Sequence, residues 1–142
     1  MKKVLVVYWS GGGNTEAMAK AVAAGAGDGG AEATLKPVGS VTAEAVKDAG
    51  ALAFGCPAMG DETLEEGEME PFIAALSQAE LGGKPLGLFG SYDWGDGQWM
   101  RTWADRMKGL GAQLDGEGII AQLEPDEGAL SECRELGKRL AL

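Results

Sequence analysis

Histidine is absent from this sequence, which excludes Ser-His catalytic triads, acid–base catalysis by imidazole and most zinc sites. Basic residues are few, since 12 lysines and arginines stand against 22 acidic residues and give a net charge of −10. That charge disfavours binding to nucleic acid or to an anionic membrane and favours partners with a basic surface. The two cysteines, Cys56 and Cys133, lie far apart and form no CxxC motif, so neither a metal knuckle nor a redox dithiol is indicated.

Long hydrophobic runs are also missing. The apolar run at residues 4–9 is followed by glycines, and it is shorter than a signal-peptide core or a membrane span. We therefore expect a cytoplasmic protein with no membrane association. A chain of 142 residues, 45% of them hydrophobic, can bury a real core, and we expect a single domain over residues 1–142.

Short apolar runs alternate with amphipathic segments along the chain. We predict strands at residues 4–9, 31–38, 51–56, 85–90 and 119–123, and helices at residues 15–26, 42–48, 70–79, 98–110 and 125–140. This alternation predicts an α/β fold, a doubly wound parallel sheet of five strands with helices on both faces. Ligands of such sheets bind at the carboxyl ends of the strands, so the loops that follow the strands should carry the function.

The loop after the first strand, residues 10–16, reads Ser-Gly-Gly-Gly-Asn-Thr-Glu. Its glycines allow a tight turn that points N–H groups into one concavity, and the following helix N-terminus adds positive dipole. Because the loop has no lysine, it is not a nucleotide-hydrolysing P-loop. We predict a cradle for a phosphate monoester, made of Ser10, Gly11, Gly12, Gly13, Asn14 and Thr15.

A second glycine-rich pattern, GxGxxG at residues 25–30, follows a helix rather than a strand. A dinucleotide-binding loop requires the opposite order, with the strand first. We interpret residues 25–30 as the turn that ends the first helix, closed by Gly25 and Gly27.

Two further loops follow buried strands. Residues 61–70, after the third strand, contain six acidic residues and no basic one, and taken alone they read as a solvated acidic loop. After the fourth strand, Tyr92 and Trp94 lie between glycines, which favours a platform on which a flat ring stacks. By contrast, Trp99 and Trp103 are one helical turn apart, so we expect them in the core.

Three segments carry a family resemblance: Tyr-Trp-Ser-Gly-Gly-Gly-Asn-Thr-Glu at residues 8–16, Cys-Pro-Ala-Met-Gly-Asp-Glu at 56–62, and Phe-Gly-Ser-Tyr-Asp-Trp-Gly-Asp-Gly at 89–97. They resemble the short-chain flavodoxins of anaerobic bacteria, and the likeness runs the whole length of the chain. The resemblance implies non-covalently bound FMN and low-potential transfer of single electrons between redox enzymes. It also implies a monomer whose acidic residues 61–70 dock basic-surfaced reductases and oxidoreductases.

The resemblance assigns roles to individual residues. Met59 would pack on one side of the flavin ring and Trp94 on the other, and Glu62 would accept a hydrogen bond from flavin N3–H. The Gly60–Asp61 peptide would turn over on reduction, so that the Gly60 carbonyl accepts a hydrogen bond from N5. The other implied residues of this part of the pocket are Pro57, Ala58, Ser91, Tyr92, Asp93 and Gly95.

Two positions depart from the family pattern. Gly12 stands where the family has threonine, which removes one phosphate donor, and Asp93 stands where it has glycine. We expect Gly12 to affect FMN affinity and Asp93, in a left-handed turn, to affect the redox potential. The three loops contain no lysine, arginine or histidine, so the second electron should enter at low potential.

Two alternatives share the doubly wound fold. A flavin-dependent quinone or nitro reductase would use the same cofactor, but such sites usually need a longer chain or an oligomer that closes over the ring. A receiver domain needs an acidic pair directly after the first strand, where this chain has Ser10. Electron transfer without a substrate of its own is therefore the leading interpretation.

Overall fold

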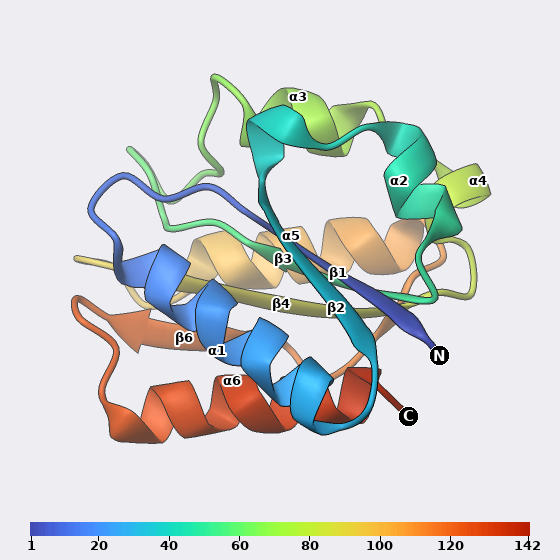
Figure 1. The fold of residues 1–142 in the computed structure, drawn as a ribbon. Helices are drawn as coiled ribbons and strands as arrows, with labels where there is room; N and C mark the ends of the chain where they lie inside the picture. The colour runs from blue at the N-terminus through green and yellow to red at the C-terminus, as the bar shows by residue number, and fades with distance from the viewer.

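A parallel sheet runs through the middle of the molecule in this computed structural model, which describes residues 1–142 (Figure 1). The strands β1 (Lys3–Tyr8), β2 (Glu32–Pro37), β3 (Ala51–Gly55) and β4 (Pro85–Tyr92) lie in the order β2-β1-β3-β4. The fifth position is shared by β5 (Gln113–Leu114) and β6 (Ile119–Gln122), which both pair with β4 in parallel. The predicted doubly wound sheet of five strands is confirmed, with its fifth strand in two pieces.

The break in the fifth strand was not predicted. β5 pairs with the start of β4, at Pro85 and Leu86, whereas β6 pairs with its end. Between them Gly116 and Gly118 have φ angles of 77° and 103°, which interrupt extended backbone. A strand of two residues is too short to show an alternating pattern, so the sequence gives no sign of β5.

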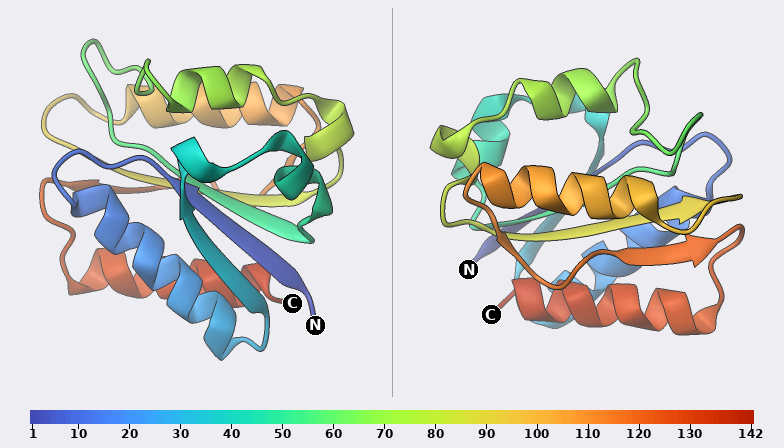
Figure 2. Two further views of the ribbon diagram at one scale, coloured as in Figure 1. Left: turned by 45° about the horizontal axis from the view of Figure 1, so that its top comes forward. Right: turned by 180° about the vertical axis from the view of Figure 1, so that it is seen from behind.

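Helices cover both faces of the sheet (Figure 2). On one face α1 (Asn14–Asp28) packs beside α6 (Glu127–Leu140). The other face is covered by α5 (Gln98–Gly109) and by the shorter elements η1 (Val38–Ser40), α2 (Ala43–Asp48), α3 (Met69–Ala74) and α4 (Gln78–Leu81).

The sheet separates two hydrophobic cores. Trp99 and Trp103 are each 1% exposed and pack in the core under α5, as predicted. The second core contains Met18, Val22 and Phe89, under α1 and α6. Each large side chain buried in this way contributes about 1.5–3 kcal/mol, so the two cores fix the positions of the helices that frame the strand ends.

The prediction that Gly25 and Gly27 close the first helix is wrong, because α1 continues to Asp28. The reason for glycine at position 25 is the neighbouring helix α6. A Cβ atom at Gly25 would collide with the backbone carbonyl of Arg134. The two helices therefore pack backbone against backbone at this point, and the glycine serves close packing rather than termination.

The helix predicted over residues 70–79 is two helices, α3 and α4. Ser77 starts the second, because its Oγ accepts a hydrogen bond from Ala79 N (3.2 Å) while Ser77 N donates to Glu80 Oε1 (2.7 Å). Such a capping box satisfies the free N–H groups of a new helix start, and it ends the periodicity of α3. The predicted cap at Thr42 is confirmed, since its Oγ1 accepts from Ala45 N (3.2 Å).

The two ends of the chain meet at the edge of the sheet where the strands begin. Lys2 Nζ donates a hydrogen bond to the backbone oxygen of Leu142 (2.7 Å). In Figure 1 the loops that follow β1, β3 and β4 lie at the other edge. None of the helices combines the length and the apolar character needed to cross a membrane.

Candidate functional site

The loops after β1, β3 and β4 line a hollow of about 340 Å³ at the carboxyl edge of the sheet. A second hollow, of about 230 Å³, lies between Met59 and Trp94 and adjoins the first, since Ala58, Met59 and Asp93 line both. The residues that line one or both are Trp9, Ser10, Gly11, Gly12, Asn14, Thr15, Pro57, Ala58, Met59, Gly60, Glu62, Ser91, Tyr92, Asp93 and Trp94.

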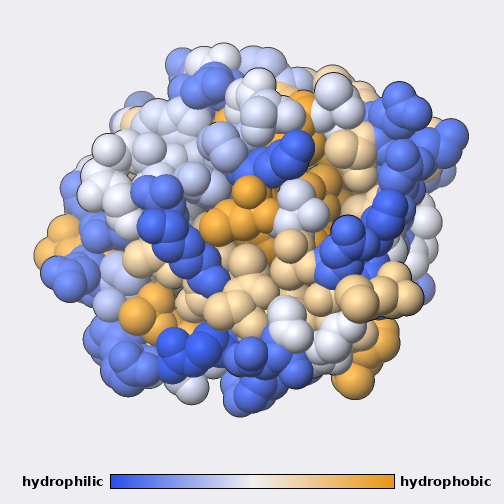
Figure 3. Space-filling model, viewed as in Figure 1, coloured by the Kyte–Doolittle hydropathy of each residue, from blue (hydrophilic) through white to orange (hydrophobic).

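The structure thus brings together almost all of the predicted site residues. Only Gly13, Asp61 and Gly95 do not line a hollow, and each lies in a turn beside one. Trp9 lines the first hollow although its sequence position placed it in the buried strand. A third hollow, of about 390 Å³, lies away from the carboxyl ends of the strands, between β2 and α2, on the face where Figure 3 shows hydrophobic surface bordered by hydrophilic residues.

The first loop presents several unused donors. Ser10 Oγ accepts hydrogen bonds from Gly13 N (3.1 Å) and Glu16 N (3.3 Å), which leaves its hydroxyl hydrogen free to donate. The backbone N–H groups of Gly12, Asn14 and Thr15 have no partner in the chain. Unpaired N–H groups at a helix N-terminus favour an anion, so the loop fits the phosphate group that the sequence predicted.

The Thr15 side chain is occupied elsewhere. Its Oγ1 lies 3.0 Å from Ser91 Oγ and accepts a hydrogen bond from Ser91 N at 3.2 Å. Both residues are buried, at 1% and 7% exposure. The threonine hydroxyl therefore joins the start of α1 to the end of β4, and only its backbone N–H is left for a ligand.

The second loop makes a tight turn between Met59 and Thr63. The N–H of each donates to the carbonyl of the other, at 2.9 Å in both directions. Within the turn Gly60 and Glu62 have φ angles of 48° and 57°. For Gly60 no atom lies within 4 Å of a possible Cβ, so the backbone angle alone explains the glycine.

The third loop places Trp94 at the surface, where it is 61% exposed, as expected of a stacking platform. The prediction that Asp93 adopts a left-handed conformation is wrong. Among the non-glycine residues, only Glu62 and Leu123 have a positive φ angle. The turn is made instead by Gly95 and Gly97, with φ angles of 90° and 95°.

Three of the six acids in the 61–70 segment have partners within the chain: Glu65, Glu70 and Glu62. Glu65 accepts hydrogen bonds from Gly67 N, Glu68 N and Met69 N at 2.6–2.9 Å. Desolvation raises the pKa of Glu65, but these three donors outweigh it and leave the pKa lowered. Glu70 forms a two-pronged ion pair with Arg106, at 2.7 Å for each N–O contact.

The Arg106 hydrogen bonds outweigh desolvation and lower the pKa of the Glu70 carboxyl. Asp61, Glu66 and Glu68 make no side-chain contact with a basic group, and all three are exposed. These three carboxylates are the part of the acidic segment that remains open to a partner.

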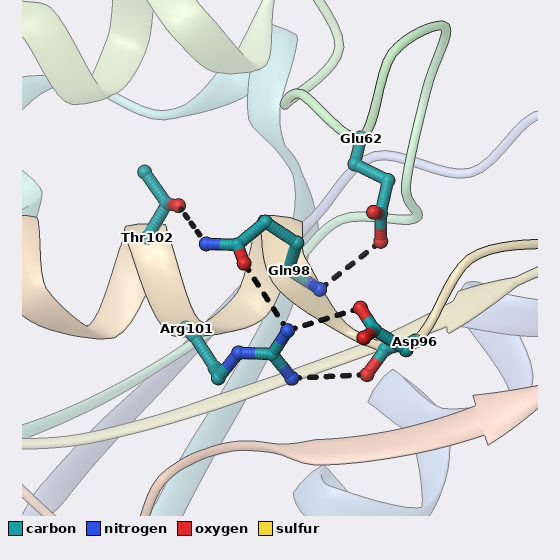
Figure 4. A network of polar contacts seen from close by, with 5 residues as sticks. All are labelled: Glu62, Asp96, Gln98, Arg101 and Thr102. Atoms are coloured by element: carbon teal, nitrogen blue, oxygen red, sulfur yellow. Dashed lines mark hydrogen bonds and ion pairs between the residues drawn. The ribbon is translucent and has the colours of Figure 1, made fainter.

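A polar network next to the site was not predicted (Figure 4). Glu62 Oε1 accepts a hydrogen bond from Gln98 N (3.0 Å) at the start of α5. Arg101, one turn further along α5, reaches back to Asp96 with an Nη2–Oδ1 distance of 3.0 Å. The loops themselves contain no basic residue, but the neighbouring helix places a cation beside them. The only feature of the sequence that could have indicated this ion pair is the spacing of five residues between Asp96 and Arg101.

The two cysteines take no part in this site as nucleophiles. Burial raises the pKa of the Cys56 thiol to about 12, although it accepts a hydrogen bond from the Glu65 N–H. Burial likewise raises the pKa of Cys133 to about 12. A thiol with such a pKa carries almost no thiolate at neutral pH. Nowhere do three or more histidine, cysteine, aspartate or glutamate side chains gather as a metal site would require.

Comparison with known proteins places this chain in a family. Residues 6–137 match the family described as Flavodoxin. The flavodoxin of Clostridium beijerinckii is 46% identical over 136 residues, which cover 96% of this chain and 97% of that protein. The flavodoxin of Megasphaera elsdenii is 42% identical over 138 residues, covering 97% and 98% of the two proteins.

The fold is similar to solved structures as well. The solution structure of two-electron reduced Megasphaera elsdenii flavodoxin superimposes with a TM-score of 0.85 at 40% identity, over 97% of this chain and 98% of that one. A flavodoxin from the domain Archaea gives a TM-score of 0.88 at 29% identity, over 98% and 96% of the chains.

Proposed function

Because this chain belongs to the flavodoxin family, whose members bind FMN and transfer electrons, we propose that it holds FMN in the two adjoining hollows at the carboxyl edge of its sheet. Its function is electron transfer rather than catalysis on a substrate of its own. The observation that carries the proposed site is the set of unpaired backbone N–H groups at Gly12, Asn14 and Thr15, next to a hollow bounded by Met59 and Trp94.

In this proposal the phosphate is held by the Ser10 hydroxyl, the Asn14 side chain and the backbone N–H groups of the loop. Met59 and Trp94 border the hollow for the flavin ring on its two sides. Bound FMN supplies the ability to accept and donate single electrons. The chain orients the ring and surrounds it with carboxylates, which oppose the addition of negative charge.

We also propose where redox partners dock. Asp61, Glu66 and Glu68 are exposed and without basic partners; Asp61 lies within the turn between Met59 and Thr63, and the two glutamates follow it. Basic-surfaced reductases and oxidoreductases would be steered to this edge by complementary charge. Glu65 and Glu70 contribute less to docking, because each is bound within the chain.

The remaining expectations belong to the same proposal. The protein acts as a single domain and as a monomer, since its two cores each lie between the sheet and its own helices. It works in the cytoplasm, a reducing compartment in which the unpaired Cys56 and Cys133 stay as thiols.

Titration of the apoprotein with FMN and with riboflavin tests the cradle. Several hydrogen bonds to a charged phosphate, at about 1.5–3 kcal/mol each, predict that FMN binds tighter by orders of magnitude. Equal dissociation constants would contradict the assignment of residues 10–15. An assay of quinone reduction by NAD(P)H distinguishes an electron carrier from the reductase alternative. We expect the FMN-loaded protein to show no turnover above that of free FMN.

A further inference from the structure

Glu62 has an unusual backbone and an unusual partner. It is one of two non-glycine residues with positive φ, a conformation that side chains with a Cβ adopt uncommonly. Its carboxylate leaves its own turn and accepts the N–H of Gln98 at 3.0 Å (Figure 4). On the way it lies against Gly95, where a Cβ would stand 2.6 Å from Glu62 Oε1. The two loops that border the second hollow are therefore in direct contact.

The N–H that Glu62 accepts belongs to the first turn of α5. The cap position of that helix, Gly97, has no side chain and provides no capping hydrogen bond. Free N–H groups at a helix start favour a carboxylate. Glu62, from a loop 36 residues away in the sequence, thus supplies the cap that Gly97 lacks.

Arg101 holds that first turn in place. Its Nη1 donates to the backbone oxygen of Asp96 at 3.0 Å, and its Nη2 donates to Asp96 Oδ1 at 3.0 Å and to Gln98 Oε1 at 3.2 Å. These contacts bracket Gly97, whose φ of 95° is the flexible point of the turn. A planar guanidinium satisfies three acceptors at once, and a lysine ammonium does not have this fork geometry.

We propose that Arg101 is a positioning residue for the FMN site. It acts through the Gln98 N–H on Glu62, so that the two loops beside the flavin hollow are aligned before the cofactor arrives. The effect of Arg101 on FMN binding rests on the function proposed above, whereas the alignment of the two loops is a property of the apoprotein.

A simpler role for Arg101 is to neutralise the charge of Asp96. The Arg101 side chain is 51% exposed, and exposed ion pairs contribute little to stability. The two roles predict different behaviour for Arg101→Lys, which keeps the charge and loses the fork. Arg134→Gln provides the matched control, because it also removes one positive charge and one ion pair, with Glu127 at 2.6 Å, but on α6.

The first measurement is amide hydrogen exchange of the apoprotein, read at Gln98. We expect Arg101→Gln to speed exchange there by about tenfold, because the turn opens more often. Arg101→Lys should speed it by nearly as much, and Arg134→Gln should leave it unchanged. If Lys restores full protection, or if Arg101→Gln behaves as Arg134→Gln does, the proposed alignment is wrong.

The second measurement is FMN affinity in a double-mutant cycle with Glu62→Ala. We expect Arg101→Gln to weaken FMN binding about fivefold when Glu62 is present and to have almost no effect when it is replaced. The visible circular dichroism of bound FMN should change in Arg101→Gln and not in Arg134→Gln. Additive effects of the two substitutions would overturn the link between Arg101 and Glu62.

The two proposals fail separately. A wild-type protein that does not bind FMN contradicts the proposed site, while exchange at Gln98 still decides whether Arg101 aligns the turn. A protein that binds FMN but shows additive effects keeps its proposed function and loses this inference.

Discussion

Thr15 and Ser91, 76 residues apart in the sequence, share a buried hydrogen bond of 3.0 Å between their hydroxyl groups. The same threonine oxygen accepts the Ser91 N–H, so one side chain satisfies two polar groups at the end of β4. This pair fixes the N-terminus of α1, which bears the proposed phosphate cradle, to the strand that leads into the Trp94 loop.

Thr15→Val should therefore destabilise the protein and weaken FMN binding together. The valine keeps the shape but leaves the Ser91 N–H and hydroxyl unsatisfied, at a cost of about 1–3 kcal/mol. Urea unfolding of the apoprotein measures the loss, and FMN titration measures the affinity. Thr15→Ser is the control, because it retains the oxygen; a serine variant as unstable as the valine variant would mean that packing, not the hydrogen bond, matters.

Gly12→Thr should tighten FMN binding about tenfold, since one added hydroxyl contact contributes around 1 kcal/mol or slightly more. The structure accommodates this side chain, because no atom lies within 4 Å of a Cβ at Gly12 and its φ is not positive. Gly12→Ala fills the same space without a donor. Fluorescence titration in which the threonine and alanine variants bind alike would show that the hydroxyl makes no contact.

Asp93→Asn should raise the midpoint potential of the second electron by a few tens of millivolts and leave the first nearly unchanged. Asp93 borders both hollows, and no basic group pairs with its carboxylate. The shift should shrink as salt is added, because the aspartate is exposed. Potentiometric titration measures both steps, with Asp28→Asn at the far end of α1 as the control for net charge. Equal movement of both potentials would contradict a local effect of Asp93.

The packing of α1 on α6 predicts opposite effects for two glycines of one helix. Gly25→Ala should cost about 2 kcal/mol or more, because its Cβ meets the backbone of Arg134. Gly27→Ala should stabilise the protein by about 0.5–1 kcal/mol, because nothing lies within 4 Å of its Cβ and alanine restricts the unfolded chain. Thermal unfolding of both variants tests this; a stabilised Gly25→Ala would refute the close approach of the helices.

Glu65 should make stability depend on pH in the acidic range. Its pKa in the folded protein lies below the ordinary value near 4.3, so the carboxylate stabilises the fold above that pH. The contribution disappears as the pH falls through the lowered pKa. Glu65→Gln should cost about 1–2 kcal/mol at pH 7 and progressively less below about pH 4. Glu66→Gln, in the same loop and without partners, should change little at any pH.

The sequence predicted the architecture well because its strands are short, apolar and regularly spaced. It also predicted most of the residues that line the hollows, although not Trp9, since loops that follow parallel strands meet at one edge. The errors arose where tertiary contacts override local pattern. Gly25 looked like a helix end because its packing partner, Arg134, is distant in the sequence. The capping box at Ser77 has the sequence pattern Ser-x-x-Glu, but it was missed because it lies within an apparently continuous apolar stripe.

Polar contacts across loops were beyond prediction for a different reason. The hydrogen bond from Gln98 to Glu62 uses a backbone N–H as donor, and every residue type except proline has such a group, so the residue type at position 98 does not predict the bond. Arg101 and Arg106 point back toward acids outside their own helix, although their positions on α5 fit ordinary solvent-facing residues. Net charge counted over a loop therefore overestimates the negative potential at its surface.

The meeting of the two chain ends beside Lys2 and Leu142 bears on how this protein could be joined to others. Any domain fused to either end begins at the edge of the sheet opposite the loops that are proposed to hold FMN, so it does not lie over them. A tether must span the length of the sheet before a fused reductase reaches the hollow. Linker length would then set the effective concentration of that reductase, and with it the rate at which electrons arrive.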